Sequence, residues 1–187
     1  MKKLITDYIF INRKKLSDAY CSFLIKELNK HIFKDSLFYD PKNKKYFSPS
    51  GKKTYKTVEE KIKNADELIN LIQLSIEKYL KKLNFPWFNN IINFTYPKFH
   101  KYSKGNLMIK HCDHIRYIFD GKNKGVPVLT IIGILNDDFK GGQTFLCDKD
   151  LKLSKGDILI FPSNFLYPHE IKEIKKGIRY SFISWAW

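Results

Sequence analysis

Cysteine is scarce in this sequence, and its pattern argues against a disulfide framework. The 187 residues include only three cysteines, Cys21, Cys112 and Cys147, and no two of them form a CxxC pair. Three thiols cannot all pair within one chain, and a structural zinc site usually needs more cysteines at closer spacing. We therefore expect reduced thiols, as in an intracellular protein.

Long apolar runs are also missing. No stretch approaches the roughly 18 apolar residues that a membrane-spanning helix needs. The N-terminal segment MKKLITDYIFINRKK is a poor signal peptide, because Asp7 interrupts its apolar stretch and no small-residue cleavage site follows. These absences predict a cytoplasmic protein with no membrane partner.

Arginine is rare although the chain is strongly basic. Only Arg13, Arg116 and Arg179 stand among the 34 basic residues, and the net charge is +15. Such a charge ordinarily suggests a nucleic acid or an anionic surface as partner. Lysine, isoleucine and asparagine share A/T-rich codons, however, so genome composition by itself can produce this charge. Nucleic acid therefore stays a candidate partner that the composition does not favour.

The length and the aromatic content indicate one domain with a filled core. A chain of 187 residues suits a single domain, and aromatic residues make up 16% of it. We expect residues 1–187 to form this domain. Residues 1–90 would supply helical support and a lid loop, and residues 91–187 the β-rich core.

Two segments before residue 90 have helical periodicity. In residues 16–31 the apolar side chains recur every three or four positions, with Ser17 as a predicted N-cap. Residues 57–85 repeat this pattern. Thr57 and Glu60 form a capping-box motif, which predicts that the second helix begins there.

Turn chemistry marks the end of the second helix and the segment between the helices. Asn84 and Pro86 predict the helix end. Residues 38–56 are rich in proline, glycine and lysine, and we expect a long exposed loop there. Loops of this length often contact substrate, which makes residues 38–56 the suspected substrate-binding segment.

After residue 90 the pattern changes to short extended segments separated by turn sequences such as DDFKGG and KLSKG. Short strands at this spacing with no helices between them indicate an antiparallel sandwich or barrel. Two helices would pack against one of its sheets. The seven predicted strands are residues 92–102, 106–112, 126–136, 143–148, 157–162, 167–174 and 178–187.

One strand end carries a histidine and an aspartate at a spacing that suits a metal. His111 and Asp113 would share one strand face while Cys112 and His114 point away, because side chains alternate along a strand. His169 is the distant histidine that completes the set. Two histidines and one carboxylate cap one face of an octahedral Fe(II) and leave positions open. The alternative is three unrelated polar residues near strand ends.

The C-terminal strands place an arginine within reach of this set. If residues 167–174 and 178–187 form a hairpin, His169 pairs with Ile183 and shares a face with Arg179, about 13 Å along the ladder. That span suits a ligand that chelates a metal at one end and offers a carboxylate to the guanidinium fork at the other. The alternative is a cross-strand ion pair between Arg179 and Glu173.

Four phrases in order now carry a family resemblance: KYSKGNLMIKHCD, ILNDDFKGGQTFL, KGDILIFPSNFLYPHEI and KKGIRYSFISW. With them the segment 99–187 resembles the 2-oxoglutarate/Fe(II) dioxygenases of the prolyl 4-hydroxylase type. The resemblance implies a mainly β fold with supporting helices, in which a double-stranded β-helix (jelly roll) packs against the N-terminal helices. It also implies that His111, Asp113 and His169 bind iron.

The resemblance further implies a co-substrate site. Arg179 matches the residue that binds the distal carboxylate of 2-oxoglutarate, and Tyr102 matches a tyrosine that hydrogen-bonds the same molecule. Thr144 matches a polar position near it, and Trp185 an aromatic that walls the pocket. Fe(II), 2-oxoglutarate and O2 are the implied cofactors and co-substrates, with ascorbate as a further candidate.

The implied reaction is hydroxylation of a C–H bond, with a prolyl side chain in a peptide or protein as the favoured substrate. A free amino acid or another small metabolite is the first alternative. A nucleic-acid dealkylase of the AlkB type is the second, but such enzymes carry another arginine where this chain has Trp185. A binding module without catalysis is favoured least, because no ligand position is lost.

Overall fold

The computed structural model describes residues 3–36, 38–40, 43, 45–47, 54–91, 93–113 and 127–187. Its elements are a 3-10 turn, η1 (Ile5–Tyr8), two α-helices and fifteen short strands. Neither described helix has the length and apolarity needed to span a lipid bilayer. His114, which was predicted to point away from His111 and Asp113, lies outside the described residues. So does Val126, the first residue of the predicted strand 126–136.

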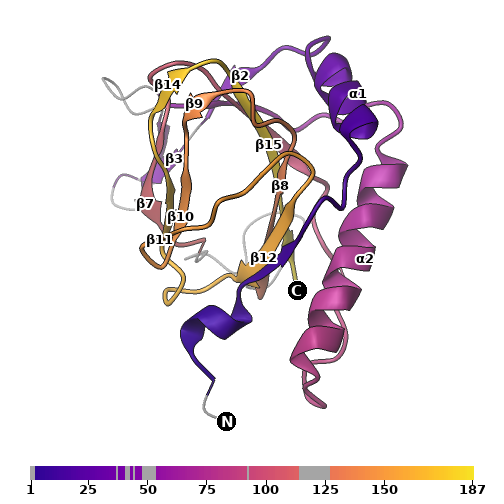
Figure 1. Cartoon of the computed structure of the whole chain (residues 1–187). Coiled ribbons are helices and arrows are strands. Elements are labelled where there is room, and N and C mark those ends of the chain that lie inside the picture. Colours follow the sequence, from indigo (N-terminus) through magenta and orange to yellow (C-terminus); the bar gives the residue numbers. More distant parts are fainter. Residues whose placement is uncertain are drawn as a thin grey trace.

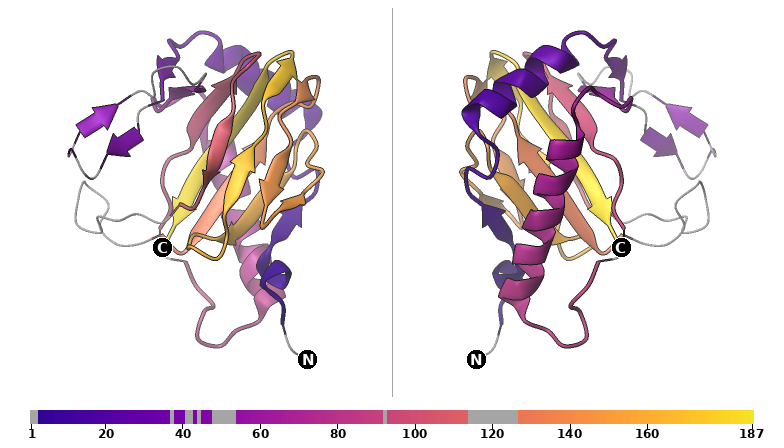
Figure 2. Two further views of the ribbon diagram at one scale, coloured as in Figure 1. Left: turned by 90° about the vertical axis from the view of Figure 1, so that its left-hand side faces the viewer. Right: turned by 90° about the vertical axis from the view of Figure 1, so that its right-hand side faces the viewer.

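Two antiparallel sheets face each other and enclose the interior of the molecule (Figures 1 and 2). In spatial order, the major sheet contains β1 (Phe10–Asn12), β12 (Ile158–Pro162), β8 (Leu129–Ile134), β15 (Arg179–Ala186), β6 (Lys98–Tyr102), β5 (Lys56–Val58) and β2 (Lys34–Asp35). The minor sheet contains β11 (Lys149–Asp150), β10 (Thr144–Leu146), β13 (His169–Ile171) and β7 (Met108–His111). The mainly β architecture expected from the sequence is therefore confirmed.

Two further strand pairs complete the described structure. β9 (Lys140–Gly141) pairs with β14 (Ile174–Lys176), and β3 (Phe38–Asp40) pairs with β4 (Lys45–Phe47). The second pair lies inside the segment 38–56, so the expectation of an open loop was wrong for that part. Tyr55, near the end of the same segment, is buried.

Both helices lie on the outer face of the major sheet (Figure 2). α1 (Asp18–Leu28) begins at Ser17, whose hydroxyl accepts a hydrogen bond from the backbone N–H of Tyr20 at 3.1 Å, as its sequence position predicted. α2 (Asp66–Leu83) ends at Asn84, which has a φ of 52°. Asparagine tolerates this left-handed conformation, which makes it a common residue at helix ends.

The predicted start of the second helix was wrong. Thr57 and Val58 belong to β5, which is hydrogen-bonded between β2 and β6, and α2 begins only at Asp66. The capping-box motif reflects only the local sequence and carries no information about pairing with a neighbouring strand. Here two β-branched residues are buried at the margin of the sheet, where their stiff side chains are well accommodated.

The largest apolar cluster joins the helices to the sheet. Leu24 of α1 and Ile72 and Ile76 of α2 are fully buried, and they belong to one cluster with Phe99 and Phe182 on the outer face of the major sheet. Burial of each such side chain stabilises the fold by about 1.5–3 kcal/mol. The helices therefore hold the major sheet from behind and leave its other face for the interior.

The predicted C-terminal hairpin was also wrong. His169 belongs to β13 in the minor sheet, whereas Arg179 begins β15 in the major sheet, between β8 and β6. β14 pairs with β9 as the chain passes from one sheet to the other, and Gly177, with a φ of 82°, makes the turn. A short glycine-containing connection looks the same in sequence whether it closes a hairpin or links two facing sheets.

Candidate metal and co-substrate site

Three side chains that could hold a metal ion meet at one end of the minor sheet. His111 at the end of β7 pairs in register with His169 at the start of β13, and Asp113 follows two residues later. Ligand atoms of the three residues all lie within 4.8 Å of one another. Asp113 Oδ1 is 3.5 Å from His111 Nε2, and Asp113 Oδ2 is 3.7 Å from His169 Nε2.

Backbone carbonyls orient both imidazole rings. Nδ1 of His111 lies 2.8 Å from the carbonyl oxygen of Ile109, and Nδ1 of His169 lies 3.2 Å from that of Tyr167. A carbonyl can only accept, so Nδ1 of each ring carries a proton in these hydrogen bonds, and Nε2 of the neutral imidazole is left with its lone pair. Both Nε2 atoms face the carboxylate of Asp113, an arrangement in which the three residues could hold a metal ion.

Two hydroxyl groups support the carboxylate from behind. Asp113 Oδ2 accepts a hydrogen bond of 2.8 Å from Thr130 on β8, and the Thr130 hydroxyl lies 2.6 Å from that of Ser163. Burial opposes the ionisation of Asp113, but the hydrogen bond with His111 and the charge of His169 outweigh it and lower the pKa to about 2. Sequence reasoning missed Thr130 and Ser163, because their only signal is an inward position in an apolar strand and in the turn after β12.

Cys112 and Trp185, two further residues considered in the sequence analysis, do not belong to this group of three. Cys112 lies outside the group of three, and its thiol contacts the carbonyl oxygen of Phe165 at 3.5 Å. Trp185 on β15 is the cross-strand partner of Thr130, and its indole N–H is buried with no hydrogen-bond partner among the described residues.

A second polar cluster surrounds Arg179 at the start of β15. Arg179 is 1% exposed, and its guanidinium donates to Thr144 at 3.2 Å and to Ser181 at 3.1 Å. Tyr102 is its register partner on β6, and the guanidinium carbon lies 5.3 Å from the centre of the tyrosine ring. The three residues expected here, Arg179, Thr144 and Tyr102, are thus brought together.

Arg179 has no anionic partner in the described part of the chain. Its hydrogen bonds go to two hydroxyl groups, and the alternative ion pair with Glu173 is not found. Burial lowers the pKa of Arg179, with Tyr102 acting in the opposite direction. A buried cation that faces only neutral groups is costly and is stabilised by a bound carboxylate.

A small cavity reaches this cluster. It has a volume of about 160 Å³ and is lined by Arg179, Thr144 and the glycine turn Gly141–Gly142, among others. A Cβ on Gly142, which has a φ of 65°, would lie 2.3 Å from Ile174 and 3.4 Å from Arg179. The turn therefore needs glycine both for its backbone conformation and for its close approach to these side chains.

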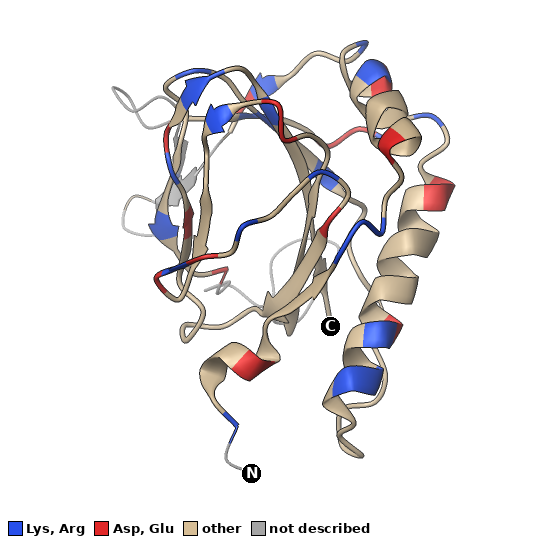
Figure 3. Cartoon of the chain, in the orientation of Figure 1, with Lys and Arg blue, Asp and Glu red and all other residues tan. Residues whose placement is uncertain are grey.

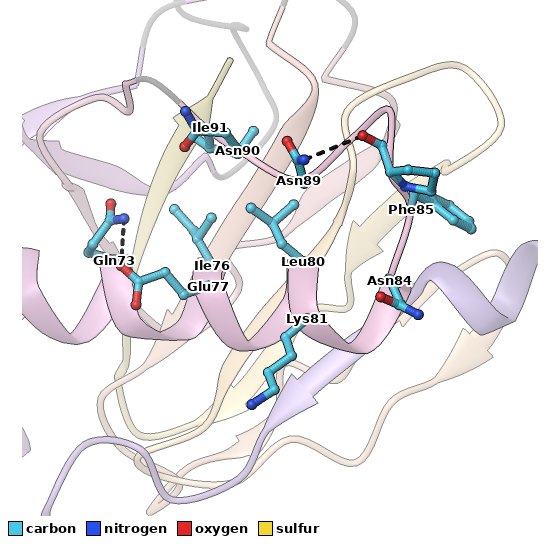
Figure 4. A pocket seen from close by; sticks show the side chains of 11 residues that line it. Gln73, Ile76, Glu77, Leu80, Lys81, Asn84, Phe85, Asn89, Asn90 and Ile91 are labelled. Atoms are coloured by element: carbon cyan, nitrogen blue, oxygen red, sulfur yellow. Dashed lines mark hydrogen bonds between the residues drawn. The ribbon is translucent and has the colours of Figure 1, made fainter.

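A larger groove lies elsewhere, along α2 on the outer side of the major sheet (Figure 4). It has a volume of about 640 Å³ and runs between α2 and the segment 84–91 that follows it. Asn89 donates a hydrogen bond of 3.3 Å to the carbonyl oxygen of Pro86 at its rim. It contains none of the residues expected in the site.

The sequence and the fold both match known oxygenases. Residues 97–187 match the family model described as the 2OG-Fe(II) oxygenase superfamily. A PKHD-type hydroxylase of Prochlorococcus marinus strain MIT 9312 is 27% identical over 94% of this chain and 76% of its own length. A second, from strain MIT 9515, is 29% identical over 73% of this chain and 64% of its own length.

Solved structures of similar fold include prolyl hydroxylases. One from Trichoplax adhaerens, in complex with a hypoxia inducible factor peptide fragment, has a TM-score of 0.69 at 18% identity over 97% of this chain and 84% of its own. A prolyl-4-hydroxylase of Pseudomonas putida has a TM-score of 0.65 at 17% identity, over 96% and 91%. These likenesses confirm the double-stranded β-helix.

The chain is similar to the 2OG-Fe(II) oxygenase superfamily over residues 97–187, just under half of its length, and to a PKHD-type hydroxylase over most of it. Fe(II) and 2-oxoglutarate are the cofactor and co-substrate that define this family. The described residues fit both groups. Two histidines and a carboxylate suit Fe(II), and the buried Arg179 without an anion suits a carboxylate of 2-oxoglutarate.

Proposed function

We propose that the chain is a 2-oxoglutarate- and Fe(II)-dependent hydroxylase of prolyl side chains in a peptide or protein. His111, Asp113 and His169 would hold the iron, and Arg179, Tyr102, Thr144 and Trp185 would surround 2-oxoglutarate. The single observation that carries the proposal is the pair of facing clusters: a metal-binding triad on the minor sheet and a buried, anion-free arginine on the major sheet.

Each cluster has its own task. Bound iron and 2-oxoglutarate supply the oxidising chemistry, in which O2 is consumed, succinate and CO2 are released and a C–H bond becomes C–OH. The chain's residues orient these groups. Nδ1–H bonds to carbonyls aim both histidines, Thr130 holds Asp113, and Arg179 fixes the far end of the co-substrate.

The names of the relatives support the choice of substrate. PKHD-type hydroxylases are similar in sequence, and prolyl hydroxylases, one of them with a peptide, are similar in fold. Residues 38–56, of which β3 and β4 form a part, are the proposed contact with the peptide. We also propose that residues 1–187 act as one domain, because a single core cluster joins the helices to the major sheet.

Charge gives little support to a nucleic-acid substrate. Lys and Arg occur on both helices and on several strands, with Asp and Glu among them (Figure 3). In a nucleic-acid dealkylase, basic residues would be expected to gather along one surface.

An intracellular, cytoplasmic location and the use of ascorbate are further parts of the proposal.

The test is succinate release by the Fe(II)-loaded protein against proline-rich peptides, free amino acids and methylated oligonucleotides, with and without ascorbate. We expect 2-oxoglutarate turnover to be coupled only to a proline-containing peptide, whose mass rises by one oxygen atom. Asp113→Ala should abolish turnover, and Asp148→Ala, at an exposed residue paired with Lys110, is the matched control. Coupled turnover with an oligonucleotide or a free amino acid instead would reject the prolyl substrate.

A further inference from the structure

His100 lies on the interior face of the major sheet, beside the residues that surround Arg179. Its side chain shares the face of Tyr102, two residues along β6. In the register of β6 and β15, Tyr102 pairs with Arg179 and His100 pairs with Ser181. Ser181 itself accepts a hydrogen bond from Arg179. His100 is therefore one row further along the sheet from the Tyr102–Arg179 pair.

The imidazole of His100 is buried without a partner for one of its nitrogens. His100 is 5% exposed, and Nε2 has no hydrogen bond to any described residue. The hydroxyl group of Tyr102 is in the same situation. Buried polar atoms are nearly always paired in folded proteins, so two orphans beside one buried guanidinium indicate a ligand that completes them.

Aromatic packing closes the other side of this face. The ring of Tyr55 lies 4.6 Å from that of His100 and stacks on that of Tyr102 at 4.8 Å. Tyr102 belongs to an apolar cluster with Met108 and Ile171 from the minor sheet. A ligand held between the sheets would supply the missing partner of His100 Nε2 and of the Tyr102 hydroxyl.

The charge state of His100 suits a hydrogen-bond donor. Burial, followed by the charges of Lys98 and Arg179, lowers its pKa well below the usual value, and Asp113 opposes them. The ring is therefore neutral near pH 7 and carries one N–H. A neutral donor adds a hydrogen bond to a carboxylate without adding another buried charge beside Arg179.

We propose that His100 is a co-substrate-binding residue, whose Nε2–H donates to the carboxylate of 2-oxoglutarate that Arg179 binds. The inference rests on the proposed function and adds a contact to it. Arg179, Tyr102 and His100 then form three donors around one carboxylate, and this set selects a 2-oxo dicarboxylate over a 2-oxo monocarboxylate.

The test is calorimetric titration of 2-oxoglutarate into the Fe(II)-loaded protein without oxygen, so that binding is measured and not turnover. His100→Leu removes the donor at similar volume, His100→Gln places an amide N–H near the position of Nε2, and His100→Asn places one near Nδ1. We expect about ten-fold weaker binding for the Leu and Asn variants, and a change of less than about three-fold for the Gln variant.

Controls separate a lost hydrogen bond from lost packing. Lys101→Ala changes the neighbouring residue, whose ammonium lies over the rings of Phe33 and Tyr180 on the outer side, and should leave binding unchanged. Iron affinity should be the same in all variants. Equal binding by wild type and His100→Leu overturns the inference, and so does equal weakening in the Leu and Gln variants, which would assign His100 a packing role. A wild-type protein that does not bind 2-oxoglutarate overturns the proposed function itself.

Discussion

At the residue scale, single hydroxyl groups on β8 and β10 support two different clusters. Thr130 donates to the carboxylate of Asp113, and Thr144 accepts from the guanidinium of Arg179. Both threonines are buried, and valine has nearly the same shape without the hydroxyl. The two positions therefore allow the proposed metal-binding and co-substrate-binding roles to be tested separately.

Replacement of Thr130 by valine should weaken iron binding. Asp113 then loses the hydrogen bond that orients its carboxylate, and losses of this kind typically reduce metal affinity by about 10–100-fold. We expect a higher dissociation constant for Fe(II) in an anaerobic titration, with little change in the 2-oxoglutarate requirement at saturating iron. Unchanged iron affinity would contradict the supporting role of Thr130.

Replacement of Thr144 by valine should have the complementary effect. Arg179 loses one of its two hydroxyl acceptors, so its guanidinium is less firmly oriented toward the co-substrate. We expect the KM for 2-oxoglutarate to rise by roughly five-fold, as the loss of one hydrogen bond predicts, while iron affinity stays as in wild type. A change in iron affinity alone, with an unchanged KM for 2-oxoglutarate, would contradict the role of Thr144 beside Arg179.

At the element scale, the packing of β15 against β8 depends on a glycine. Gly133 of β8 pairs with Phe182 of β15, and a Cβ on the glycine would lie 1.9 Å from Cε1 of that ring. Gly133→Ala should therefore force the phenylalanine out of its place and destabilise the protein by about 1–3 kcal/mol. Urea unfolding measures this, with Val128→Ala on an exposed side chain as control. The double variant Gly133→Ala, Phe182→Leu should recover part of the loss.

The first helix depends on its cap. Ser17→Ala removes the acceptor for the N–H of Tyr20 and should reduce the free energy of unfolding by about 1 kcal/mol. Ser22→Ala on the same helix is the control, because its hydroxyl donates to the carbonyl of Asp18, which already belongs to the helix. An equal loss in both variants would mean that the effect is general to serine in α1 and does not come from capping.

At the scale of the whole molecule, the two clusters lie on different sheets, so ligands held between them should stabilise the complete fold. A ligand at 100 times its dissociation constant stabilises the native state by about 2.7 kcal/mol. For a chain of this length that corresponds to a rise in Tm of roughly 5–10 °C. We expect this rise when Fe(II) and 2-oxoglutarate are added together without oxygen, no rise in Asp113→Ala, and the full rise in Asp148→Ala.

Strand alternation in the sequence predicts which side chains of the two clusters share a face. Alternation along a strand predicted that His111 and Asp113 point together, and that Arg179, Ser181 and Ile183 share one face of their strand. Arg179 and Ser181 are hydrogen-bonded to each other, and Ile183 belongs to the interior cluster. All seven strands predicted after residue 90 are present with shorter bounds. Such features depend on residues near one another in the chain, and their period of two is visible in the sequence.

Which sheet each strand joins depends on contacts between segments that are distant in sequence. A hairpin and a crossing between facing sheets use the same turn residues, and so His169 and Arg179 were assigned to one ladder although they belong to opposite sheets. Likewise, the local capping-box pattern predicts a helix cap at Thr57, whereas pairing with β6 makes this residue part of a strand. Thr130 and Ser163 make their hydrogen bonds, and His100 has a buried nitrogen without a partner, only because the fold buries them beside residues distant in sequence.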